Sequence, residues 1–410
     1  MNTLVMTYDG GTSLSKIIYR VFRDEQPESV KHLVAQPEVI RLLDPSFLQN
    51  IEQLSSEISG WLQLPPRKEK KYYAVGKLAS DLGATSSIRS LKHFGFVPKI
   101  LAAVGAIAVS EKLLPDTFTL SLCCLLPYSE YGNGSQLEAA LKSALKGYWF
   151  SGHRIKANLA FYKHFPEGVG LALEVKRRLG ADWKKLKRAA VLIFGYRNTS
   201  CLFFDQGDFS PVLSTSTDYG FYHLLDFAAQ KLPGISREKI QETIVTTTEE
   251  YVDVQQQKRL SRLLTLIDYS RLLVETSPAQ RNKHLEIIKS ALSAAKFHYW
   301  QLISKFLYEV ECSGVNVIYY GGGSSIFIKD KLFQYCNERN IPLVSSSELD
   351  SVKSQSNIQT LPPLIEILNL NSYERESFIT QNLGVRFADV WNLFVNTTHY
   401  EQEYFQDLSA

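Results

Sequence analysis

The same local pattern, two β-strands joined by a turn rich in glycine and hydroxyl side chains, occurs twice in this chain, about half a chain length apart. The first copy consists of two strand-like runs and the turn between them, Leu4–Tyr8, Asp9–Ser13 and Ile17–Phe22. The second copy has the same parts in the same order, Ala189–Phe194, Gly195–Ser200 and Cys201–Phe204. Repetition of a structural unit at this distance predicts two related domains that face one another across a cleft.

The length and composition of the chain fit two globular domains. Its 410 residues are more than twice the ~150 residues of a typical domain. Hydrophobic residues make up 45% of the chain and charged residues 21%, which excludes a largely disordered, collagen-like or low-complexity protein. Helical and strand-like segments alternate along the sequence, so we predict an α/β fold.

Apolar periodicity predicts further elements. We expect helices over Lys99–Lys112, Gln136–Leu145, Val169–Leu179, Lys283–Glu311 and Ile328–Arg339. We expect strands over Tyr72–Val75, Phe118–Leu126 and Val315–Tyr320. The alternation of these elements supports the α/β assignment.

Two regions depart from this regular alternation. We expect an inserted subdomain at about residues 35–70. Within it, the apolar residues of Pro37–Gly60 have helical spacing, and Pro65-Pro66 ends this pattern. Towards the C-terminus, the Ser/Gln/Asn-rich stretch Ser345–Thr360 is expected to be a loop or linker. A last helix is expected between Tyr373 and Phe394.

The charge balance argues against direct binding to nucleic acid or to a membrane. The chain has 45 Lys and Arg residues against 42 Asp and Glu, a net charge of +3. This excess is too small for a protein that coats nucleic acid or a membrane surface. The longest apolar stretch, Ile100–Val109, is far shorter than the ~20 residues that span a bilayer.

The cysteines and the N-terminus indicate a cytoplasmic protein. The five cysteines contain no CxxC motif and do not cluster with histidines, so we expect reduced thiols rather than a zinc site. The N-terminal residues lack the positive region and the apolar core of a secretory signal.

The first turn has the composition of a phosphate-binding loop. Backbone N–H groups must approach a phosphate closely, which requires glycine, and short hydroxyl side chains and a cation add further contacts. Gly11, Thr12, Ser13 and Lys16 supply these groups, and Asp9 supplies a carboxylate for a hydrated Mg²⁺. Taken alone, the motif is more often a simple β-turn that binds nothing.

A second glycine turn lies late in the chain. Gly321, Gly322, Gly323 and Ser324 separate a predicted buried strand from a predicted helix, where a glycine turn lets a flat base or a phosphate lie against the backbone. The motif is weak in isolation. It is not the GxxxxGK[ST] loop of P-loop proteins, which does not occur in this sequence.

The order of these features resembles the actin-like ATPase superfamily. An Asp-led N-terminal hairpin, Pro166-Glu167-Gly168 before a crossing helix, a second Gly/Thr/Ser hairpin and a late strand followed by GGGS occur in sequence. Tyr73–Ala79, Leu126–Tyr128 and Asp218–Gly220 add to the resemblance. The pattern covers nearly the whole chain and is most similar to the bacterial ParM and Alp branch of plasmid-segregating actins.

The resemblance implies a role for each candidate residue. Asp9, Gly11, Thr12, Ser13 and Lys16 match the first phosphate loop, in which the lysine contacts the phosphates and the aspartate holds the metal through water. The second phosphate loop would be formed by Gly195, Tyr196, Arg197 and Thr199, and the nucleotide loop by Gly321, Gly322, Gly323 and Ser324. Glu167 matches the residue that orients the attacking water. The alternative is a carboxylate that only stabilises the start of the following helix.

The chain departs from the family pattern at Ile193. The second loop of the family usually begins with an aspartate two residues before its glycine, and Ile193 stands at that place. An isoleucine cannot join the hydration shell of a metal, so we expect slow nucleotide hydrolysis. Asp205, one strand further on, could substitute for the missing carboxylate, and a surface carboxylate is the alternative.

The resemblance also implies an overall function. We expect an actin-like, ribonuclease H-like fold of two domains that binds ATP or GTP with Mg²⁺ in the interdomain cleft. Residues 1–182 and 363–410 would form domain I, and residues 183–362 would form domain II. The protein would assemble into filaments that segregate a plasmid or other DNA, with a DNA-binding adaptor protein as a further partner.

Two other functions fit the same superfold. A sugar or acetate kinase would phosphorylate a small molecule. This reaction needs a base beside a pocket for the acceptor hydroxyl, and we find no sugar-binding motif in the sequence between the phosphate loops. A non-hydrolysing actin-like scaffold is the other alternative, and Ile193 favours it. The fold alone does not choose among these functions.

Overall fold

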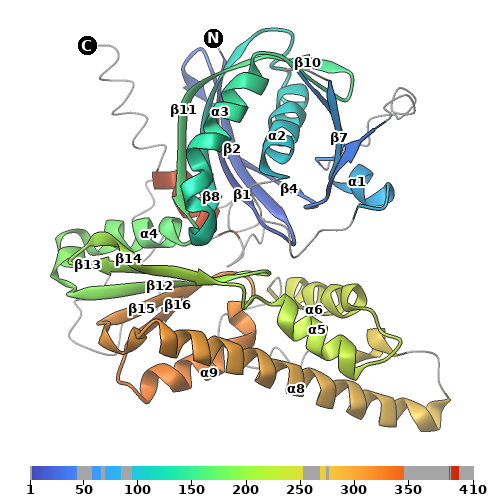
Figure 1. The fold of residues 1–410 in the computed structure, drawn as a ribbon, viewed down its shortest axis with the longest axis vertical. Coiled ribbons are helices and arrows are strands. Elements are labelled where there is room, and N and C mark those ends of the chain that lie inside the picture. Colours follow the sequence, from blue (N-terminus) through green and yellow to red (C-terminus); the bar gives the residue numbers. More distant parts are fainter. Residues whose placement is uncertain are drawn as a thin grey trace. The chain divides into compact units, whose positions relative to one another are not determined.

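The computed structural model, shown in Figure 1, describes residues 2–43, 58–65, 70–84, 95–252, 268–273, 277–345, 387 and 389–396. The chain forms two compact units. Unit 1 comprises Met1–Glu174 and Asp389–Ala410, and unit 2 comprises Val175–Ala388. The chain leaves unit 1 within helix α4 (Val169–Leu179) and returns to it at Asp389.

Unit 1 is built from two β-sheets with helices packed on them. Its strands are β1 (Thr3–Gly10), β2 (Ser15–Arg23), β3 (Gln26–Pro27), β4 (Lys31–Ala35), β5 (Val39–Leu42), β6 (Gly60–Leu64), β7 (Lys71–Val75), β8 (Phe118–Leu126), β9 (Tyr148–Phe150), β10 (His153–Ile155) and β11 (Ala157–Pro166). Its helices are α1 (Lys77–Asp81), α2 (Phe96–Ser110), the 3₁₀ turn η3 (Tyr128–Asn133), α3 (Gly134–Leu145), the first part of α4 and a helical segment at residues 389–396.

The larger sheet of unit 1 has the order β11-β8-β1-β2-β3, and β4 also pairs with β2. Strand β1 pairs antiparallel with β2 and parallel with β8, and β8 pairs parallel with β11. Strand β8 is apolar along nearly its whole length and buried on both faces, as expected for a central strand with parallel neighbours. The smaller sheet has the order β10-β9-β6-β7-β5.

Helix α2 fills the core of unit 1. Most of its residues are fully buried, and it packs against strands of both sheets. Gly105 lies so close to Phe150 that an added Cβ atom would be 2.6 Å from the phenyl ring. A helix that is apolar all round must be buried on every side, which agrees with this position.

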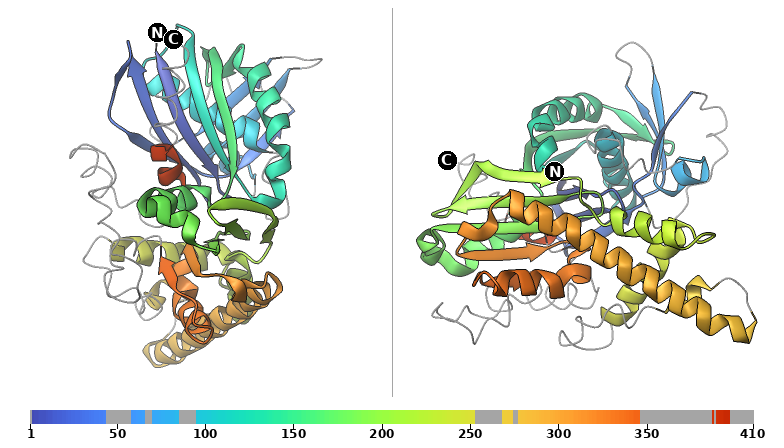
Figure 2. Two further views of the ribbon diagram at one scale, coloured as in Figure 1. Left: turned by 90° about the vertical axis from the view of Figure 1, so that its left-hand side faces the viewer. Right: turned by 60° about the horizontal axis from the view of Figure 1, so that its bottom comes forward.

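Unit 2 contains one sheet and a set of long helices. Its strands are β12 (Arg188–Phe194), β13 (Thr199–Asp205), β14 (Asp208–Thr217), β15 (Val317–Gly321) and β16 (Leu343–Ser345). Its helices are α5 (Tyr222–Lys231), α6 (Arg237–Val252), α8 (Pro278–Glu309) and α9 (Ser325–Asn337), with 3₁₀ turns η4 (Gly180–Lys185), η6 (Tyr269–Leu272) and η7 (Cys312–Gly314). Figure 2 shows the long helix α8 beside α5 and α9, and α8 contacts both of them.

The sheet of unit 2 has the order β14-β13-β12-β15-β16. Strand β12 pairs antiparallel with β13 and parallel with β15, and β15 pairs parallel with β16. This is the arrangement of β1, β2, β8 and β11 in unit 1. The two hairpins therefore occupy equivalent places in two sheets of the same plan.

The structure confirms most of the predicted elements. Both hairpins form, and the bounds of β8 and α4 are those expected from the sequence. The predicted helices correspond to α2, α3, α8 and α9, and the predicted strands to β7 and β15. The last predicted helix is present at residues 387 and 389–396, whereas its earlier part and residues 346–360 lie outside the described residues.

The helical prediction for Pro37–Gly60 is wrong at its start. Val39–Leu42 forms strand β5, which pairs antiparallel with β7. The β-branched pair Val39-Ile40 suits a strand, and pairing with β7 outweighs the weak helical spacing of this segment. Residues 44–57 lie outside the described residues.

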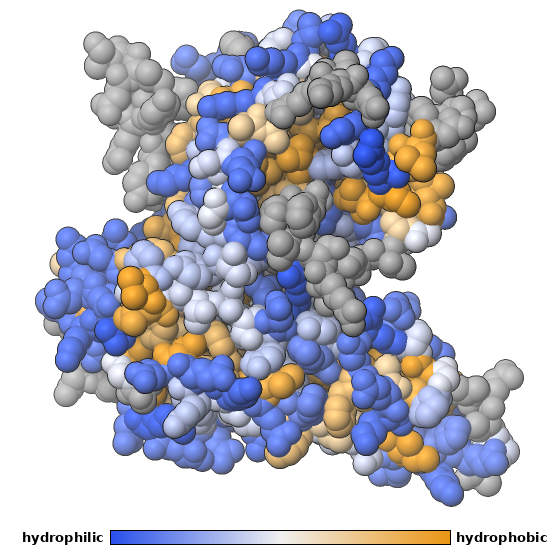
Figure 3. Space-filling view, viewed as in Figure 1, coloured by the Kyte–Doolittle hydropathy of each residue, from blue (hydrophilic) through white to orange (hydrophobic). Residues whose placement is uncertain are grey.

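The described surface and core agree with the composition. Hydrophilic side chains dominate the face shown in Figure 3, and hydrophobic residues form small separate groups on it. All five cysteines are buried free thiols, as the sequence predicts. Within the part of the chain that the structure describes, no helix is long and apolar enough to cross a bilayer.

Candidate functional site

The first candidate loop lies at the tip of the β1–β2 hairpin in unit 1. Asp9 and Lys16 face each other in the antiparallel register, and the Lys16 ammonium donates to the Asp9 carboxylate. Both side chains are largely buried, with 12% of Asp9 and 15% of Lys16 exposed. Desolvation strengthens such an ion pair relative to a surface pair. The hairpin thus holds a shielded cation and anion beside the turn.

The turn itself requires glycine. A Cβ atom on Gly11 would lie 2.4 Å from the Leu14 carbonyl oxygen, so the chain closes on itself too tightly for any side chain there. Thr12 follows, and its Oγ1 atom is buried and has no hydrogen-bond partner. Ser13 is half-buried. The structure therefore gathers Asp9, Gly11, Thr12, Ser13 and Lys16 at one turn, and the threonine hydroxyl is available to a ligand.

Glu167 lies at the same edge of the unit 1 sheet. It directly follows β11, whose last residue pairs with the last residue of β8, and Asp9 pairs with Leu125 of β8. The backbone N–H of Glu167 donates to the Leu126 carbonyl at 2.8 Å, and only 6% of the residue is exposed. The carboxyl ends of parallel strands are where ligands bind in open α/β sheets. Asp9 and Glu167 therefore belong to one edge.

The structure adds a carboxylate that the sequence did not single out. Asp389 Oδ2 accepts a hydrogen bond from the Gly168 N–H at 2.6 Å, and Oδ1 accepts one from the Leu171 N–H at 3.2 Å. The pKa of Asp389 is raised to about 7, chiefly by burial and also by the nearby charges of Asp9 and Glu167, while the two backbone donors partly oppose this rise. More than 200 residues separate Asp389 from Gly168, so no local pattern could reveal this contact.

The second candidate loop is the β12–β13 turn of unit 2. The Gly195 N–H donates to the Asn198 carbonyl at 2.9 Å, and a Cβ atom on Gly195 would lie 2.8 Å from that oxygen. Gly11 and Leu14 have the same spacing and the same close approach in unit 1. The last paired residues are Gly10 and Ser15 in the unit 1 hairpin and Phe194 and Thr199 in the unit 2 hairpin. In both hairpins, four residues lie between the two members of this pair.

The unit 2 turn is held by the start of α5. The Phe221 N–H donates to the Gly195 carbonyl at 3.1 Å, and the Thr199 hydroxyl donates to the Tyr219 carbonyl at 2.7 Å. A Cβ atom on Gly220 would lie 2.1 Å from the carbonyl carbon of Arg197, so the two segments are in direct contact. The Asp218–Gly220 signature therefore serves to brace this turn.

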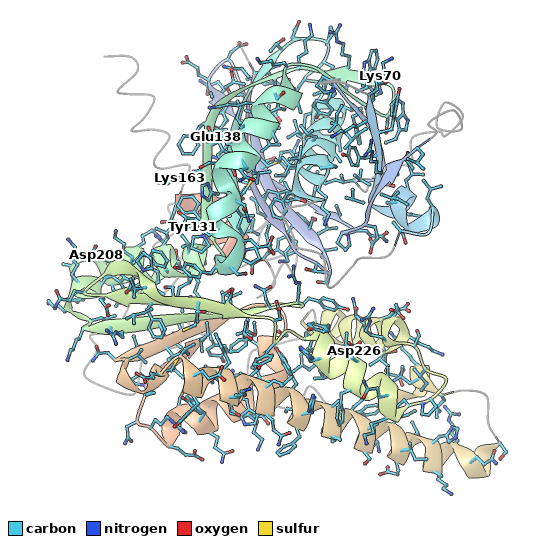
Figure 4. All side chains as sticks on the ribbon, viewed as in Figure 1. Lys70, Tyr131, Glu138, Lys163, Asp208 and Asp226 are labelled. Atoms are coloured by element: carbon cyan, nitrogen blue, oxygen red, sulfur yellow. The ribbon has the colours of Figure 1, made fainter. Side chains whose placement is uncertain are left out.

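Tyr196 and Arg197 also lie in polar surroundings. The Tyr196 hydroxyl donates to Gln241 Oε1 at 2.9 Å, and burial raises the pKa of Tyr196. The Arg197 guanidinium lies 3.9 Å from the Asp218 carboxylate. Near Tyr196, the Arg237 guanidinium donates to the Asp226 carboxylate at 3.1 Å. Asp226 is labelled on α5 in Figure 4. Tyr196 is thus positioned by α6, and Arg197 lies beside the segment that precedes α5.

The GGGS segment reaches the unit 2 turn from the neighbouring strand. Gly322 has a φ of +92°, and its Cβ would lie 2.4 Å from the Phe194 carbonyl oxygen, so only glycine fits. The Ser324 hydroxyl donates to the same oxygen at 2.9 Å and lies 3.3 Å from the Tyr299 hydroxyl. Gly321 pairs with Ile193 in the parallel register. Gly321, Gly322, Gly323 and Ser324 are therefore beside the second loop, immediately before α9.

Ile193 occupies the place in unit 2 that Asp9 occupies in unit 1. Ile193 pairs with Ser200 one step before the last register pair, just as Asp9 pairs with Lys16. Ile193 is 8% exposed, and the Ser200 hydroxyl is buried without a hydrogen-bond partner. An isoleucine and a serine have replaced the ion pair on an otherwise equivalent turn.

Asp205 does not substitute for the missing carboxylate. It pairs with Arg188 at the opposite end of the β12–β13 hairpin, and its carboxylate accepts from Arg188 Nε at 2.6 Å. The alternative interpretation of Asp205 as a surface carboxylate therefore holds. Among the described residues, no group of three or more His, Cys, Asp or Glu side chains is arranged to hold a metal directly.

Comparison with known proteins gives structural matches only. No protein-family model matches the chain, and no curated protein sequence matches it. The chain is similar to ParM of Bacillus thuringiensis with AMPPNP, at a TM-score of 0.57 and 13% identity over 98% of this chain and 100% of that one. It is also similar to the actin-like protein Alp7A, at a TM-score of 0.59 and 11% identity over 100% of both chains.

An archaeal actin homologue is a third match, at a TM-score of 0.52 and 15% identity over 97% of this chain and 99% of that one. At these identities the matches establish the fold and not the activity. They confirm the fold predicted from the order of the sequence motifs. The chain has an actin-like, two-domain α/β fold of the ParM and Alp type.

Proposed function

We propose that this chain is a nucleotide-dependent, filament-forming actin-like protein. In this proposal it binds ATP or GTP with Mg²⁺ through the hairpin turns of both units and hydrolyses the nucleotide slowly. The observation that carries the proposal is the buried Asp9–Lys16 pair at a glycine turn, on the sheet edge that also holds Glu167. Desolvation largely offsets the attraction within a buried ion pair, so ligand binding explains this pair better than stability of the turn does.

The unit 1 turn fits the phosphates of a nucleotide. The Lys16 ammonium has three donor positions, so it can contact a phosphate while it remains bonded to Asp9. The buried Thr12 hydroxyl lacks a partner and can donate to a phosphate oxygen. Gly11 lets the turn close tightly, because a side chain there would meet the Leu14 carbonyl, and the backbone N–H groups of such a turn can bind an anion. These groups match the chemistry of a polyphosphate.

Mg²⁺ would be held through water by Asp9, and when bound it would neutralise charge on the phosphates. Glu167 would accept a hydrogen bond from the attacking water and orient it. Its burial favours this role, because a shielded carboxylate interacts strongly with a bound water. In unit 2, Gly195, Tyr196, Arg197 and Thr199 and the GGGS segment would contact the remainder of the nucleotide.

Assembly and cellular role rest on the fold. The structures similar to this chain include ParM of Bacillus thuringiensis with ATP and with ADP. We propose that nucleotide binding promotes self-association into filaments in the cytoplasm. The filaments would segregate a plasmid or other DNA, to which a DNA-binding adaptor protein connects them.

A non-hydrolysing scaffold is the second candidate, favoured by Ile193. In that case the protein would still bind nucleotide through unit 1 and assemble, but it would release no phosphate. Both candidates share the binding site, so a binding measurement supports either and a hydrolysis measurement separates them.

Negative-stain electron microscopy with ATP, GTP, slowly hydrolysed analogues or no nucleotide tests the proposal. Filaments that form only with nucleotide, together with slow phosphate release, are the expected result. Phosphate transfer to a sugar or acetate in a coupled assay, without filaments, would instead identify a kinase. Absence of nucleotide binding by calorimetry would refute both candidates.

A further inference from the structure

The segment at Asp389 is bound to the two parts of unit 1 that carry the candidate site. The Asp389 carboxylate accepts hydrogen bonds from Gly168 and Leu171 in the first turn of α4. Thr7 lies on β1, two residues before Asp9. Its hydroxyl donates to the Val390 carbonyl at 3.2 Å. Asp389 and Val390 therefore connect the strand of Asp9 to the peptide that follows Glu167.

The peptide that follows Glu167 needs an external support. Gly168 has a φ of +103°, in the region where glycine is conformationally permissive and imposes little direction on the chain. The peptide before Glu167 is fixed by its own hydrogen bond to Leu126. The hydrogen bond from Gly168 to Asp389 fixes the peptide on the other side. Glu167 is thus held at both of its peptide bonds.

The contact with Asp389 is built into the backbone as well as the side chain. A Cβ atom on Gly170 would lie 1.9 Å from the Asp389 carbonyl oxygen, so the first turn of α4 approaches this segment closely. The two carboxylate oxygens accept from two of the N–H groups that a helix leaves unpaired at its start. A carboxylate at a helix N-terminus is further stabilised by the helix dipole.

We propose that Asp389 is a positioning residue, which holds the Glu167–Gly168 peptide and thereby aims the Glu167 carboxylate. This inference rests on the proposed role of Glu167 in nucleotide hydrolysis. The hydrogen bonds of Asp389 go to the backbone N–H groups of Gly168 and Leu171, so we expect it to affect hydrolysis through the direction of Glu167. Misplacement of a catalytic group by about 1 Å can cost ~10²-fold in rate.

Asp389→Asn tests the inference in the whole protein. The amide oxygen can accept from one N–H, but the amide nitrogen is a donor and cannot accept from the other. We expect nucleotide affinity to change by less than about threefold, because the phosphate loop is intact, and the hydrolysis rate to fall by about 10- to 100-fold. Asp205→Asn, a carboxylate-to-amide change outside the site, should alter neither.

A double-mutant cycle distinguishes positioning from general damage. If Asp389 acts through Glu167, Asp389→Asn should change the residual hydrolysis rate by less than about twofold in a Glu167→Gln background. An equal loss of rate in both backgrounds would overturn the proposal. If Asp389→Asn fails to fold, Thr7→Val removes the hydroxyl that binds Val390, and the same cycle applies with a smaller expected loss.

Hydrogen exchange of the nucleotide-free protein provides a readout that does not depend on hydrolysis. In Asp389→Asn, the amides of Gly168 and Leu171 should exchange at least about tenfold faster than in the wild type, because they lose a hydrogen-bond acceptor. Unchanged protection would show that Asp389 does not hold this turn, and the inference would be wrong even if nucleotide is hydrolysed. Faster exchange in Asp389→Asn, combined with a wild type that hydrolyses no nucleotide, would instead refute the proposed function and, with it, the role of Asp389 in catalysis.

Discussion

The hairpin turns of the two units share a backbone and differ in charge. Each turn closes with the same four-residue spacing and the same close glycine approach, and each lies on a central strand with one antiparallel and one parallel neighbour. The register pair one step before the last is Asp9 and Lys16 in unit 1 and Ile193 and Ser200 in unit 2.

The groups that surround the two turns also differ in charge. In unit 1 the neighbouring groups are the carboxylates of Glu167 and Asp389. In unit 2 the turn has one cation, Arg197, which lies 3.9 Å from the Asp218 carboxylate, and its other neighbours are backbone carbonyls and hydroxyls, such as those of Phe194 and Ser324. Unit 1 therefore concentrates carboxylates and a paired lysine at its turn, whereas the shape of the unit 2 turn is fixed mainly by glycine and by hydrogen bonds. This contrast predicts that charge substitutions matter most in unit 1 and shape substitutions in unit 2.

The largest effect is expected from Lys16→Ala. The substitution removes the cation beside the proposed phosphates and leaves Asp9 buried without its partner. Loss of one member of a buried charge pair typically costs ~2–5 kcal/mol, so nucleotide affinity should fall well over tenfold in calorimetry. Lys142→Ala, on the exposed face of α3 and paired with Glu138, is the matched control. Equal affinities in Lys16→Ala and the control would exclude this turn from the site.

Glu167→Gln should follow, with a loss confined to hydrolysis. A single positioned group in an active site is worth ~10²–10³ in rate, and a glutamine retains the size of the side chain while it loses the charge. Phosphate release should slow by that factor while nucleotide affinity stays within about threefold. Glu138→Gln on α3 serves as the control. A phosphate-release rate equal to that of the wild type would leave Glu167 as a carboxylate that only stabilises the start of α4.

Gly322→Ala tests the importance of shape in unit 2. The new methyl group would meet the Phe194 carbonyl at 2.4 Å, and the backbone has a φ of +92°. Strain of this kind with a backbone clash should lower the free energy of unfolding by about 3 kcal/mol, measured by urea denaturation. Gly314→Ala, where an added Cβ meets no atom within 4 Å, should be nearly neutral. Equal stabilities of the two variants would contradict a shape-determined turn.

The carboxylate of Asp389 gives unit 1 a pH dependence of stability. Its pKa is about 7 in the folded chain and near 3.8 when unfolded, so the folded state binds the proton more tightly. The associated stability is fully present below about pH 4 and is lost as the pH rises through 7. Asp389→Asn lacks this contribution.

The stability of the wild type relative to Asp389→Asn should therefore decrease by about 2 kcal/mol between pH 5 and pH 8. Urea midpoints of both proteins at four pH values in this range measure the difference. A difference that does not change with pH would show that Asp389 is ionised throughout.

The sequence singled out the local parts of the candidate site and missed its long-range contact. Gly11, Lys16 and the GGGS segment were recognisable because glycine, hydroxyl and cationic residues lie within a few positions of one another. The strand β5 was missed because its pairing with β7 decides the structure of a weakly periodic segment. Asp389 was missed because its hydrogen bonds join residues more than 200 positions apart. Such contacts depend on the folded topology and leave no local pattern.

The smallest effect is expected from Ile193→Asp, which gives unit 2 the charge that unit 1 has at the equivalent position. Burial of a carboxylate is costly unless it is hydrogen-bonded. Ser200 lies opposite in the register, on the same face of the sheet, and its buried hydroxyl lacks a partner and can donate to the new carboxylate. The variant should therefore fold. Comparison of its melting temperature with that of the wild type checks this expectation.

If the missing carboxylate limits hydrolysis, phosphate release by Ile193→Asp should rise about tenfold, below the full value of a positioned group because the surroundings evolved around isoleucine. Ile193→Asn, which has nearly the same size without the charge, is the matched control and should not accelerate release. Faster turnover should also shorten filament lifetimes in light scattering. If a folded Ile193→Asp variant is no faster than the wild type, position 193 does not limit the rate, and the difference in charge between the two turns has another cause.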